Sequence, residues 1–367
     1  MNNRLCEMFG IEAPIFAFSH CRDVVVEVSK AGGLGVLGMA RARADRVEED
    51  LRWIDAHIGG RPYGVDILMP ATYEDVAEVD IDVLPAEHVA FVQKLLDDAG
   101  IPRLLPEQAD RAARELLAGF HMTPQESLRM LEVCLRHPIK LIVNALGSPP
   151  RELVERAHGL GIKVGALAGK ARHALKHRAV GCDLVVAVGT EAAGHTGDIG
   201  SMVLWPRIAD AVAPLPVLGG GGVGRGRQLA AALALGCEGV WCGSIWLKTV
   251  QSELVPEIRA KLLAAGEGDA VLTPTVTGKS CRTLRNAFTE AWDQPGAPQT
   301  LPAPLQNMLW WAHGRTRVER VKAEAFLTYP VGQLVGDMNE ESSVRQVVQD
   351  MLQELAETKE RLDAMLG

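Results

Sequence analysis

Short apolar runs alternate along the chain with segments whose apolar residues recur every three or four positions. The runs span four or five residues and are bounded by Gly, Pro or polar residues, which is typical of strands buried on both faces. The first part of the chain shows this pattern most regularly. Strands are predicted at 14–18, 34–37 and 64–68, and helices at 24–31 and 44–58.

The same alternation resumes near residue 139. Five further strands are predicted at 139–143, 162–166, 183–187, 216–219 and 238–242. Helices are predicted between and around them at 150–158, 170–180, 205–213 and 225–235. Eight strands, nearly all followed by a helix, predict an α/β fold of the (β/α)8 barrel type, which usually needs about 250 residues. A doubly wound open sheet is the alternative architecture.

Two segments lie outside the repeat. Residues 70–138 hold no clear strand but three helical patterns, each introduced by a Pro, at 86–99, 107–119 and 124–136. We interpret this segment as a helical insertion after the third strand. The remaining surplus is residues 251–367, with a helix at 253–265, a polar stretch at 267–283 and a Pro-rich linker at 295–304.

The chain ends in a long amphipathic pattern over 341–366. Its apolar residues are spaced by three and four, which predicts one helix that packs on its own protein rather than on a partner. The predicted organisation is therefore a barrel over 1–250, with the helical insertion, followed by a smaller α-rich cap and terminal helix over 251–367. Because both additions attach at the carboxyl edge of the strands, we expect them to decide which small molecule reaches the barrel.

Charge and composition narrow the class of protein. The formal net charge is −8 and no dense Lys/Arg run is present, which argues against sequence-independent binding of nucleic acid. No apolar span reaches 18 residues and no signal-peptide pattern opens the chain, so we expect a soluble, cytoplasmic protein that binds no membrane. The seven cysteines are scattered without a C-x-x-C pair, which predicts reduced, mostly buried thiols. No cluster has metal-ligand spacing.

Four consecutive glycines, Gly219 to Gly222, stand between the seventh predicted strand and the next helix. Their backbone N–H groups can approach an anion closely, and the helix behind them adds positive charge, so a phosphate is the natural ligand. The run also fits G-x-G-x-x-G, but the acidic residue at the required distance, Glu238, begins a strand instead of ending one. Gly243 and Ser244 follow the eighth strand, where barrels commonly complete a phosphate site.

A second signal is the segment from Gly189 to Gly197, directly after the sixth strand. It contains His195 among small residues at the expected catalytic edge, so a ligand can approach the imidazole closely. The unperturbed pKa of imidazole suits proton abstraction or donation at neutral pH. Two weaker candidates share this edge: Cys242 as a nucleophile, and Asp66 as either a cofactor contact or a turn carboxylate.

These segments together resemble the nitronate monooxygenase family, formerly called 2-nitropropane dioxygenases. The resemblance rests on PIFAF (14–18), AGGLGVLG (31–38), PYGVDIL (62–68), VGTEAAGHTG (188–197), PVLGGGGVGRGRQLAAALALGCEGVWCGS (216–244) and GKSCRTLRNAFTEAW (278–292). The later PVGQLVGDMNE (330–340) is similar to the C-terminal region of longer bacterial members. The resemblance implies an FMN-dependent barrel enzyme that oxidises alkyl nitronates with O2 and releases a carbonyl compound and nitrite.

The resemblance also assigns residues. The family's E-A-G-G-H-x-G motif lies over residues 191–197 and gives His195 the role of catalytic base. It implies flavin contacts at eight positions: Ala17, Asp66, Ala193, Gly194, Gly221, Gly222, Gly243 and Ser244. The sequence departs from the family at three places: Ala193 replaces a Gly, Asp66 replaces an Asn, and Phe18-Ser19 replaces a Met-containing turn. An ionised Asp66 near the flavin would disfavour an anionic nitronate, whereas a protonated one would not.

Two other functions remain open from the sequence. The same kind of barrel serves FMN-dependent enoyl and quinone reductases that use NAD(P)H. A protein of another class, a flavin-binding module without catalysis, is also consistent with the three departures. The expected partners are a small-molecule substrate and O2, and a homodimer is left open.

Overall fold

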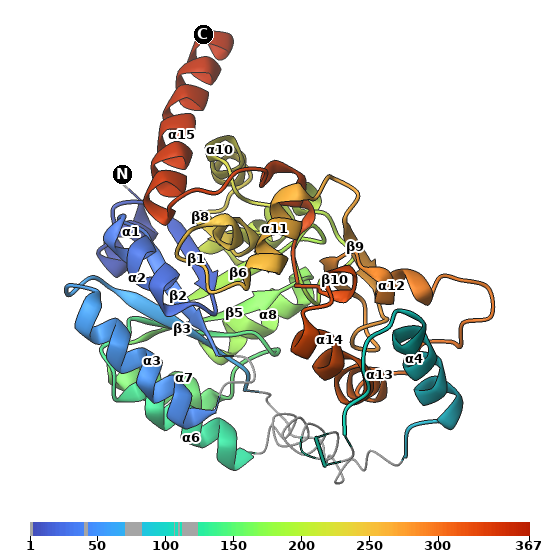
Figure 1. Cartoon of the computed structure of the whole chain (residues 1–367). Coiled ribbons are helices and arrows are strands. Elements are labelled where there is room, and N and C mark those ends of the chain that lie inside the picture. The colour runs from blue at the N-terminus through green and yellow to red at the C-terminus, as the bar shows by residue number, and fades with distance from the viewer. Residues whose placement is uncertain (1–2, 40–42, 70–82, 106, 109–110, 112–123) are drawn as a thin grey trace.

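Eight parallel strands form a closed barrel in the computed structural model, which describes residues 3–39, 43–69, 83–105, 107–108, 111 and 124–367 (Figure 1). Each strand pairs with the next along the chain, and β8 pairs with β1. The strands are β1 (Ile15–Ser19), β2 (Leu34–Gly38), β3 (Tyr63–Ile67), β4 (Leu141–Asn144), β5 (Lys163–Ala168), β6 (Leu184–Val188), β7 (Val217–Gly220) and β8 (Gly239–Cys242). The predicted (β/α)8 barrel is confirmed, and closure through β1 and β8 excludes the open sheet.

A ring of helices covers the outside of the barrel. It consists of α2 (Arg22–Lys30), α3 (Ala44–His57), α6 (Pro124–Leu135), α7 (Arg151–Gly159), α8 (Ala171–Val180), α9 (Ser201–Val212) and α10 (Gly226–Ala234). Helix α6 packs against α3, so it is the ring helix between β3 and β4. The sequence pattern assigned this helix to the insertion, because about 55 residues separate it from β3 and the short spacing typical of a βα unit is lost. The helix predicted at 107–119 lies almost entirely outside the described residues.

The barrel interior is filled by side chains from alternate strand positions. They form one apolar cluster that includes Phe16, Val36, Val143, Leu218 and Trp241. A short helix that the sequence pattern did not predict, α1 (Arg4–Phe9), adds Leu5, Cys6 and Phe9 to the same cluster. Glu238 accepts hydrogen bonds from Arg4 beside this helix. The barrel is thus packed shut at its amino end, and Glu238 lies there, away from the glycine loop.

The segment after the barrel forms a second layer over the carboxyl ends of the strands. Its elements are η2 (Ser244–Lys248), α11 (Pro256–Ala264), β9 (Ala270–Thr273), β10 (Cys281–Leu284), α12 (Ala287–Ala291), α13 (Leu305–Trp310), the π-helical η3 (Trp311–Arg315), α14 (Thr316–Val321), η4 (Glu324–Phe326) and η5 (Gln333–Asp337). Strands β9 and β10 pair as an antiparallel hairpin.

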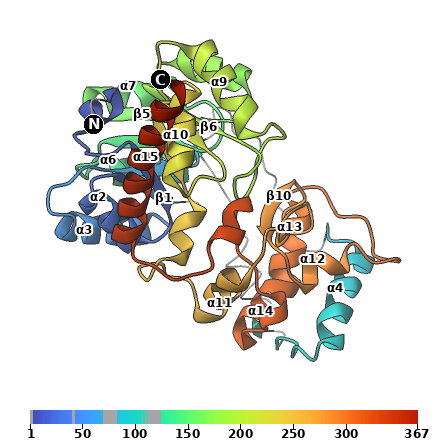
Figure 2. The same cartoon turned by 90° about the horizontal axis from the view of Figure 1, so that it is seen from above.

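Helix α4 (Ala86–Asp98) leaves the barrel region and packs on this second layer, against α13 and η3 (Figures 1 and 2). It shares an apolar cluster with residues from the far end of the chain, among them Phe288, Trp310 and Phe326. We call α4 and residues 270–329 together the cap. The cap is therefore built from two segments that are distant in the sequence.

The terminal helix α15 (Val344–Leu366) packs its first half on α10 and α2. Val344, Val347, Val348 and Met351 are buried there. Glu354 accepts hydrogen bonds from Arg225 and Arg227 and so ties α15 to the start of α10. The last turns project beyond the body of the molecule (Figure 1), and Met365 and Leu366 are exposed. Among the described residues, no helix has the length and apolar content required to cross a membrane.

Candidate active site

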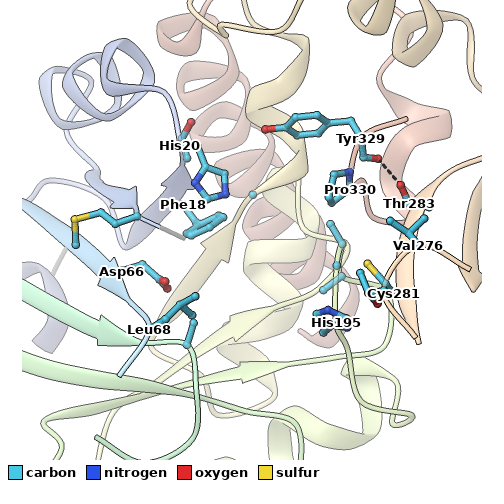
Figure 3. A pocket seen from close by; sticks show the side chains of 18 of the residues that line it. Phe18, His20, Asp66, Leu68, His195, Val276, Cys281, Thr283, Tyr329 and Pro330 are labelled. Carbon is cyan, nitrogen blue, oxygen red and sulfur yellow. Dashed lines mark hydrogen bonds between the residues drawn. The ribbon is translucent and has the colours of Figure 1, made fainter. Parts of the chain in front are cut away.

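A cavity of about 1650 Å³ lies between the carboxyl ends of the strands and the cap (Figure 3). Its floor includes inward-facing side chains from four strands: Phe18 of β1, Leu167 of β5, Val188 of β6 and Trp241 of β8. Tyr329 and Pro330 reach it from the side of the cap. Because β-strands that run parallel all end at the same edge, residues far apart in the sequence meet here.

The predicted phosphate loops both lie on the cavity wall. Gly221 and Gly222 follow β7 with φ angles of +107° and +71°, a region that side chains rarely adopt. A Cβ on Gly221 would lie 3.0 Å from the carbonyl oxygen of Gly189, so this position also lacks room for a side chain. Gly243 and Ser244, after β8, line the same cavity.

Glu191 supports the first of these loops from behind. Its carboxylate accepts hydrogen bonds from the backbone N–H and the hydroxyl of Ser201, at 2.9 Å and 2.7 Å, where α9 begins. A carboxylate at a helix N-terminus is stabilised by the unpaired N–H groups there. The Ser201 hydroxyl also lies 3.2 Å from the carbonyl oxygen of Gly221. Through Ser201, Glu191 therefore helps to hold the glycine loop in place.

Residues 330–334 also approach these loops, a contact that no pattern in the sequence predicts. The Ser244 hydroxyl accepts a hydrogen bond of 2.9 Å from the backbone N–H of Gly332. A Cβ on Gly332 would lie 2.7 Å from the carbonyl oxygen of Glu191, so only glycine fits between the two loops. The Ser244 hydroxyl keeps its own hydrogen for a ligand, because it is only the acceptor in this contact.

His195 lies on a loop that is fastened to the cap. Its Nδ1 is 3.1 Å from the carbonyl oxygen of Ser280. A carbonyl can only accept, so Nδ1 carries the hydrogen and Nε2 of the neutral ring holds the free lone pair. The neighbouring Gly194 exchanges backbone hydrogen bonds with Arg282 of β10, at 2.9 Å and 2.7 Å. The imidazole is exposed in the cavity with its tautomer set by the cap.

Arg282 is buried beneath this loop. Its guanidinium donates to the carbonyl oxygens of Thr190 and Ala270, at distances from 3.0 to 3.3 Å. Burial lowers the pKa of this guanidinium below its ordinary value, and the charge of Glu191 opposes that shift. The side chain thus links the start of the His195 loop, at Thr190, to β9, at Ala270.

Asp66 is the buried acid of the cavity floor. Its side chain points into the cavity among apolar neighbours and only 3% of the residue is exposed (Figure 3). Its Oδ2 has no hydrogen-bond partner among the described residues. Burial raises the pKa of this carboxyl well above its ordinary value. Burial therefore favours the protonated acid, whose O–H group could donate to a ligand in the cavity.

The other candidates are placed as follows. Ala193 and Gly194 line the cavity. The Ala17 side chain packs outward in the core between the barrel and its helices, so only its backbone could serve a ligand. Cys242 packs in that same core, and burial raises the pKa of its thiol, which makes it a poor nucleophile. All seven cysteines are buried and none forms a disulfide, as expected from their spacing.

His20 and Tyr329 are cavity residues that the sequence reading missed. His20 follows β1 and rests on Phe18 with ring centroids 5.1 Å apart, and its Nδ1 donates to the carbonyl oxygen of Gly38 over 2.7 Å. Its place directly after a strand is the signal that also identified His195 and could have identified His20. The backbone carbonyl of Tyr329 accepts hydrogen bonds from the Thr283 hydroxyl and the Leu284 N–H of the cap, which no local pattern reveals.

A cluster of Cys21, Asp23 and Glu253, two of which line the cavity, brings potential metal ligands within 4.8 Å of one another. The Cys21 thiol donates to the carbonyl oxygen of Gln251, and burial raises its pKa to about 11. A protonated thiol is a poor metal ligand. These residues carry no metal assignment.

Comparison with known proteins agrees with this geometry. A family model described as nitronate monooxygenase matches residues 2–354. A protein of Mycobacterium tuberculosis, Rv1533, provisionally named a monooxygenase, is 46% identical over 378 residues and covers 100% of both chains. A protein of Staphylococcus haemolyticus, provisionally named nitronate monooxygenase, is 27% identical over 84% of this chain and 85% of its own length.

Solved structures show the same fold. The structure of nitroalkane oxidase from Streptomyces ansochromogenes has a TM-score of 0.78 and 24% identity, covering 98% of this chain and 99% of its own. The structure of FabK from Thermotoga maritima has a TM-score of 0.72 and 22% identity, covering 100% and 99%. Because the family model spans nearly the whole chain and the mycobacterial relative aligns end to end, the protein belongs to the nitronate monooxygenase family, a family of flavin enzymes.

Proposed function

We propose that the protein binds FMN and oxidises alkyl nitronates with O2, yielding a carbonyl compound and nitrite. The observation that carries this proposal is the convergence of two glycine loops and one oriented imidazole on a single cavity. The loops suit a phosphate, and the imidazole suits a proton transfer at a carbon beside a nitro group. Family membership supports the same chemistry.

The residues present fit FMN. Gly221, Gly222, Gly243 and Ser244 would hold the phosphate, because all four line the cavity and Ser244 adds a hydroxyl. Gly221 and Gly222 lie at positive φ angles with close neighbours that leave little space for a Cβ. Asp66 and His195 would face the flavin ring system. When bound, FMN supplies the acceptor for the electrons that leave the substrate carbon.

The chain's own residues would handle the proton and the charge. His195 Nε2 would accept a proton from the carbon of a neutral nitroalkane, or in its protonated form pair with the oxygens of a nitronate. The Ser280 carbonyl would hold the ring in the required tautomer throughout. The neutral Asp66 carboxyl would not repel an anionic substrate, so its presence in place of an amide is compatible with a nitronate.

The test is a pair of matched histidine variants of the FMN-loaded protein. His195→Asn is expected to retain FMN and to lose on the order of 10² to 10⁴ in kcat/KM with nitroalkanes, the usual effect of removing a general base. His57→Asn is the control, because the Nδ1 of His57 also bonds a backbone carbonyl, that of Trp53, on the outer helix α3. Equal kcat/KM for His195→Asn and the control would remove His195 from the mechanism.

The same preparation tests the other functions. A protein that takes up no FMN contradicts the proposal outright. Rapid anaerobic bleaching of the flavin by NADH would indicate an NAD(P)H-dependent reductase. Bound flavin without turnover of either kind would indicate a binding module.

A further inference from the structure

One continuous helical run of the cap, from Leu305 to Val321, forms part of the cavity wall. It begins as α13, widens into the π-helical turn η3, and continues as α14. Asn307, Trp311 and Arg315 follow one another at intervals of four along it, and all three line the cavity. Single π-helical turns inside α-helices are rare and recur at functional sites.

The sequence is adapted to this π-helical turn. A Cβ at Gly314 would collide with the ring of Trp310, so glycine leaves the space that this ring occupies. The Thr316 hydroxyl donates to the carbonyl oxygen of Trp311 over 3.3 Å and occupies an acceptor in the widened turn. The turn thereby places Trp310 and Trp311 together on the cavity wall.

The wall around these two residues is apolar and firmly packed. Trp310 stacks on Phe288 with ring centroids 3.9 Å apart. Arg315 lies 4.0 Å from the ring centroid of Trp311, and its charge is paired with Glu319 over 2.5 Å. Three more cap residues extend the apolar surface: Val276, Phe326 and Leu327. Such a surface suits a long uncharged chain or ring.

Asn307 breaks this apolar wall with one buried acceptor. Only 6% of the residue is exposed, and its Oδ1 has no hydrogen-bond partner among the described residues. An unpaired buried polar group is costly, so an acceptor of this kind on a cavity wall calls for a donor from the ligand. Arg315 already places a positive charge on the Trp311 ring, which disfavours a second cation beside it and points to a neutral donor, a hydroxyl or an amide N–H.

We propose that Asn307, Trp310 and Trp311 form a distal substrate subsite, which binds an apolar chain bearing a hydroxyl or amide N–H group. The proposal rests on the proposed function, because it takes the reacting end of the substrate to lie at His195. The cavity of about 1650 Å³ supports it. Pockets for one drug-sized ligand span about 300 to 1,000 Å³, so there is room for a cofactor and an extended substrate. Small nitroalkanes would leave the subsite empty.

The experiment compares the nitronates of 1-nitropropane, 1-nitrooctane and 8-nitrooctan-1-ol with FMN-loaded enzyme. For the wild type, kcat/KM is expected to rise at least about tenfold from the first to the second, since each buried CH2 contributes up to about fourfold. It should rise again, about threefold or more, with the terminal hydroxyl. Trp311→Ala should lower the octyl-to-propyl ratio about tenfold. Asn307→Leu should abolish the advantage of the hydroxyl while keeping that of the chain.

Trp53→Ala is the control, because Trp53 stacks on His57 on the outer helix α3. It should keep both ratios. Ratios that do not change with chain length in the wild type, or that change in the subsite variants no more than in the control, would overturn the subsite. Because each ratio is internal to one variant, a partly inactive preparation does not disturb it.

A second measurement separates this inference from the proposed function. If no nitronate is oxidised, the proposed function fails, and the subsite is tested by calorimetric titration of the purified protein with propanoate, octanoate and 8-hydroxyoctanoate. A subsite at Asn307 and Trp311 predicts affinity in that increasing order, with the last step lost in Asn307→Leu. Equal affinities for the three acids would overturn it.

Discussion

The surroundings of Asp66 in the folded protein determine its ionisation, and its position in the sequence does not predict them. Its position after a buried strand indicated only that it lies at the catalytic edge, beside either a cofactor or a turn. The structure surrounds it with Phe18, Leu68 and other apolar groups and leaves Oδ2 unpaired (Figure 3). Burial is the cause of its raised pKa, and no charged group among the described residues contributes. The surroundings of Asp66 thus favour its neutral form.

This state predicts a pH dependence of stability. In the unfolded chain an Asp ionises near pH 3.9, whereas folded Asp66 keeps its proton to a higher pH. Above about pH 3.9 the folded state therefore binds more protons, and stability falls as pH rises, by up to about 1.4 kcal/mol per pH unit until the raised pKa is passed. Asp66→Asn should remove this loss.

Urea unfolding of the FMN-free protein at several pH values measures the effect. Asp66→Asn should match the wild type near pH 4 and become progressively more stable than it toward pH 7. The exposed Asp210→Asn serves as the control and should follow the wild type throughout. A difference between Asp66→Asn and wild type that does not grow with pH would mean that Asp66 is ionised in the folded protein.

At the scale of elements, strands and their following loops were predictable and long-range contacts were not. All eight strands overlap their predicted ranges, because a strand buried on both faces must be a continuous apolar run. Parallel topology then places Gly221, Ser244 and His195 at one edge without further information. Helix α1 was missed because six residues are too few to show a helical period.

The approach of Gly332 to the phosphate loops was missed for a different reason. Its contacts with Ser244 and Glu191 span large separations in the chain, and nothing local marks it. The same holds for Ser280, whose carbonyl orients His195. Sequence patterns thus brought the candidate site residues to one edge but did not reveal the contacts that hold them.

The glycine loop after β7 gives a prediction at this scale. Gly221→Ala adds a methyl group 3.0 Å from the Gly189 carbonyl oxygen at a φ of +107°, so the loop must shift. We expect FMN affinity to fall at least about tenfold, which corresponds to about 1.4 kcal/mol. Gly59→Ala is the matched control, since Gly59 also has a positive φ, +65°, but nothing within 4 Å of the added carbon.

Fluorescence titration of the flavin-free proteins with FMN distinguishes the two variants. The control should lose some stability through backbone strain, on the order of 1 kcal/mol, and keep its affinity for FMN. If Gly221→Ala binds FMN as tightly as the control does, the phosphate lies elsewhere.

At the scale of the whole molecule, the chain builds its cap from two distant segments, and this decides the shape of the cavity roof. Helix α4 supplies Val92 and Leu96 to the cluster around Trp310, so the wall of the distal subsite is supported by residues that precede β4. The sequence predicted both segments as additions at one edge. Their mutual packing could not be predicted, because it depends on side chains about 200 positions apart.

Arg317 is the polar link between these segments. Only 4% of it is exposed, and its guanidinium donates to the carbonyl oxygens of Ile101 and Pro102 and pairs with Asp97 over 2.7 Å. Arg103, from the same turn, also pairs with Asp97, and the two cations lower the pKa of that carboxyl to about 2, Arg103 having the larger effect. This network closes the end of α4 against α14.

Arg317→Met should open this junction while leaving the barrel folded. Methionine fills a similar volume but cannot donate, so the buried carbonyl group of Ile101 loses its partner, at a cost of about 1–3 kcal/mol. Arg103 then becomes the site to observe, because trypsin cleaves after it only when residues 99–105 detach from the cap. We expect cleavage after Arg103 to accelerate on the order of tenfold or more in Arg317→Met. The control is Arg361→Met on the exposed last turns of α15, which should be cleaved after Arg103 like the wild type. If Arg317→Met is cleaved no faster than this control, the two segments are held together by their apolar cluster alone, and the roof of the cavity does not depend on the buried arginine.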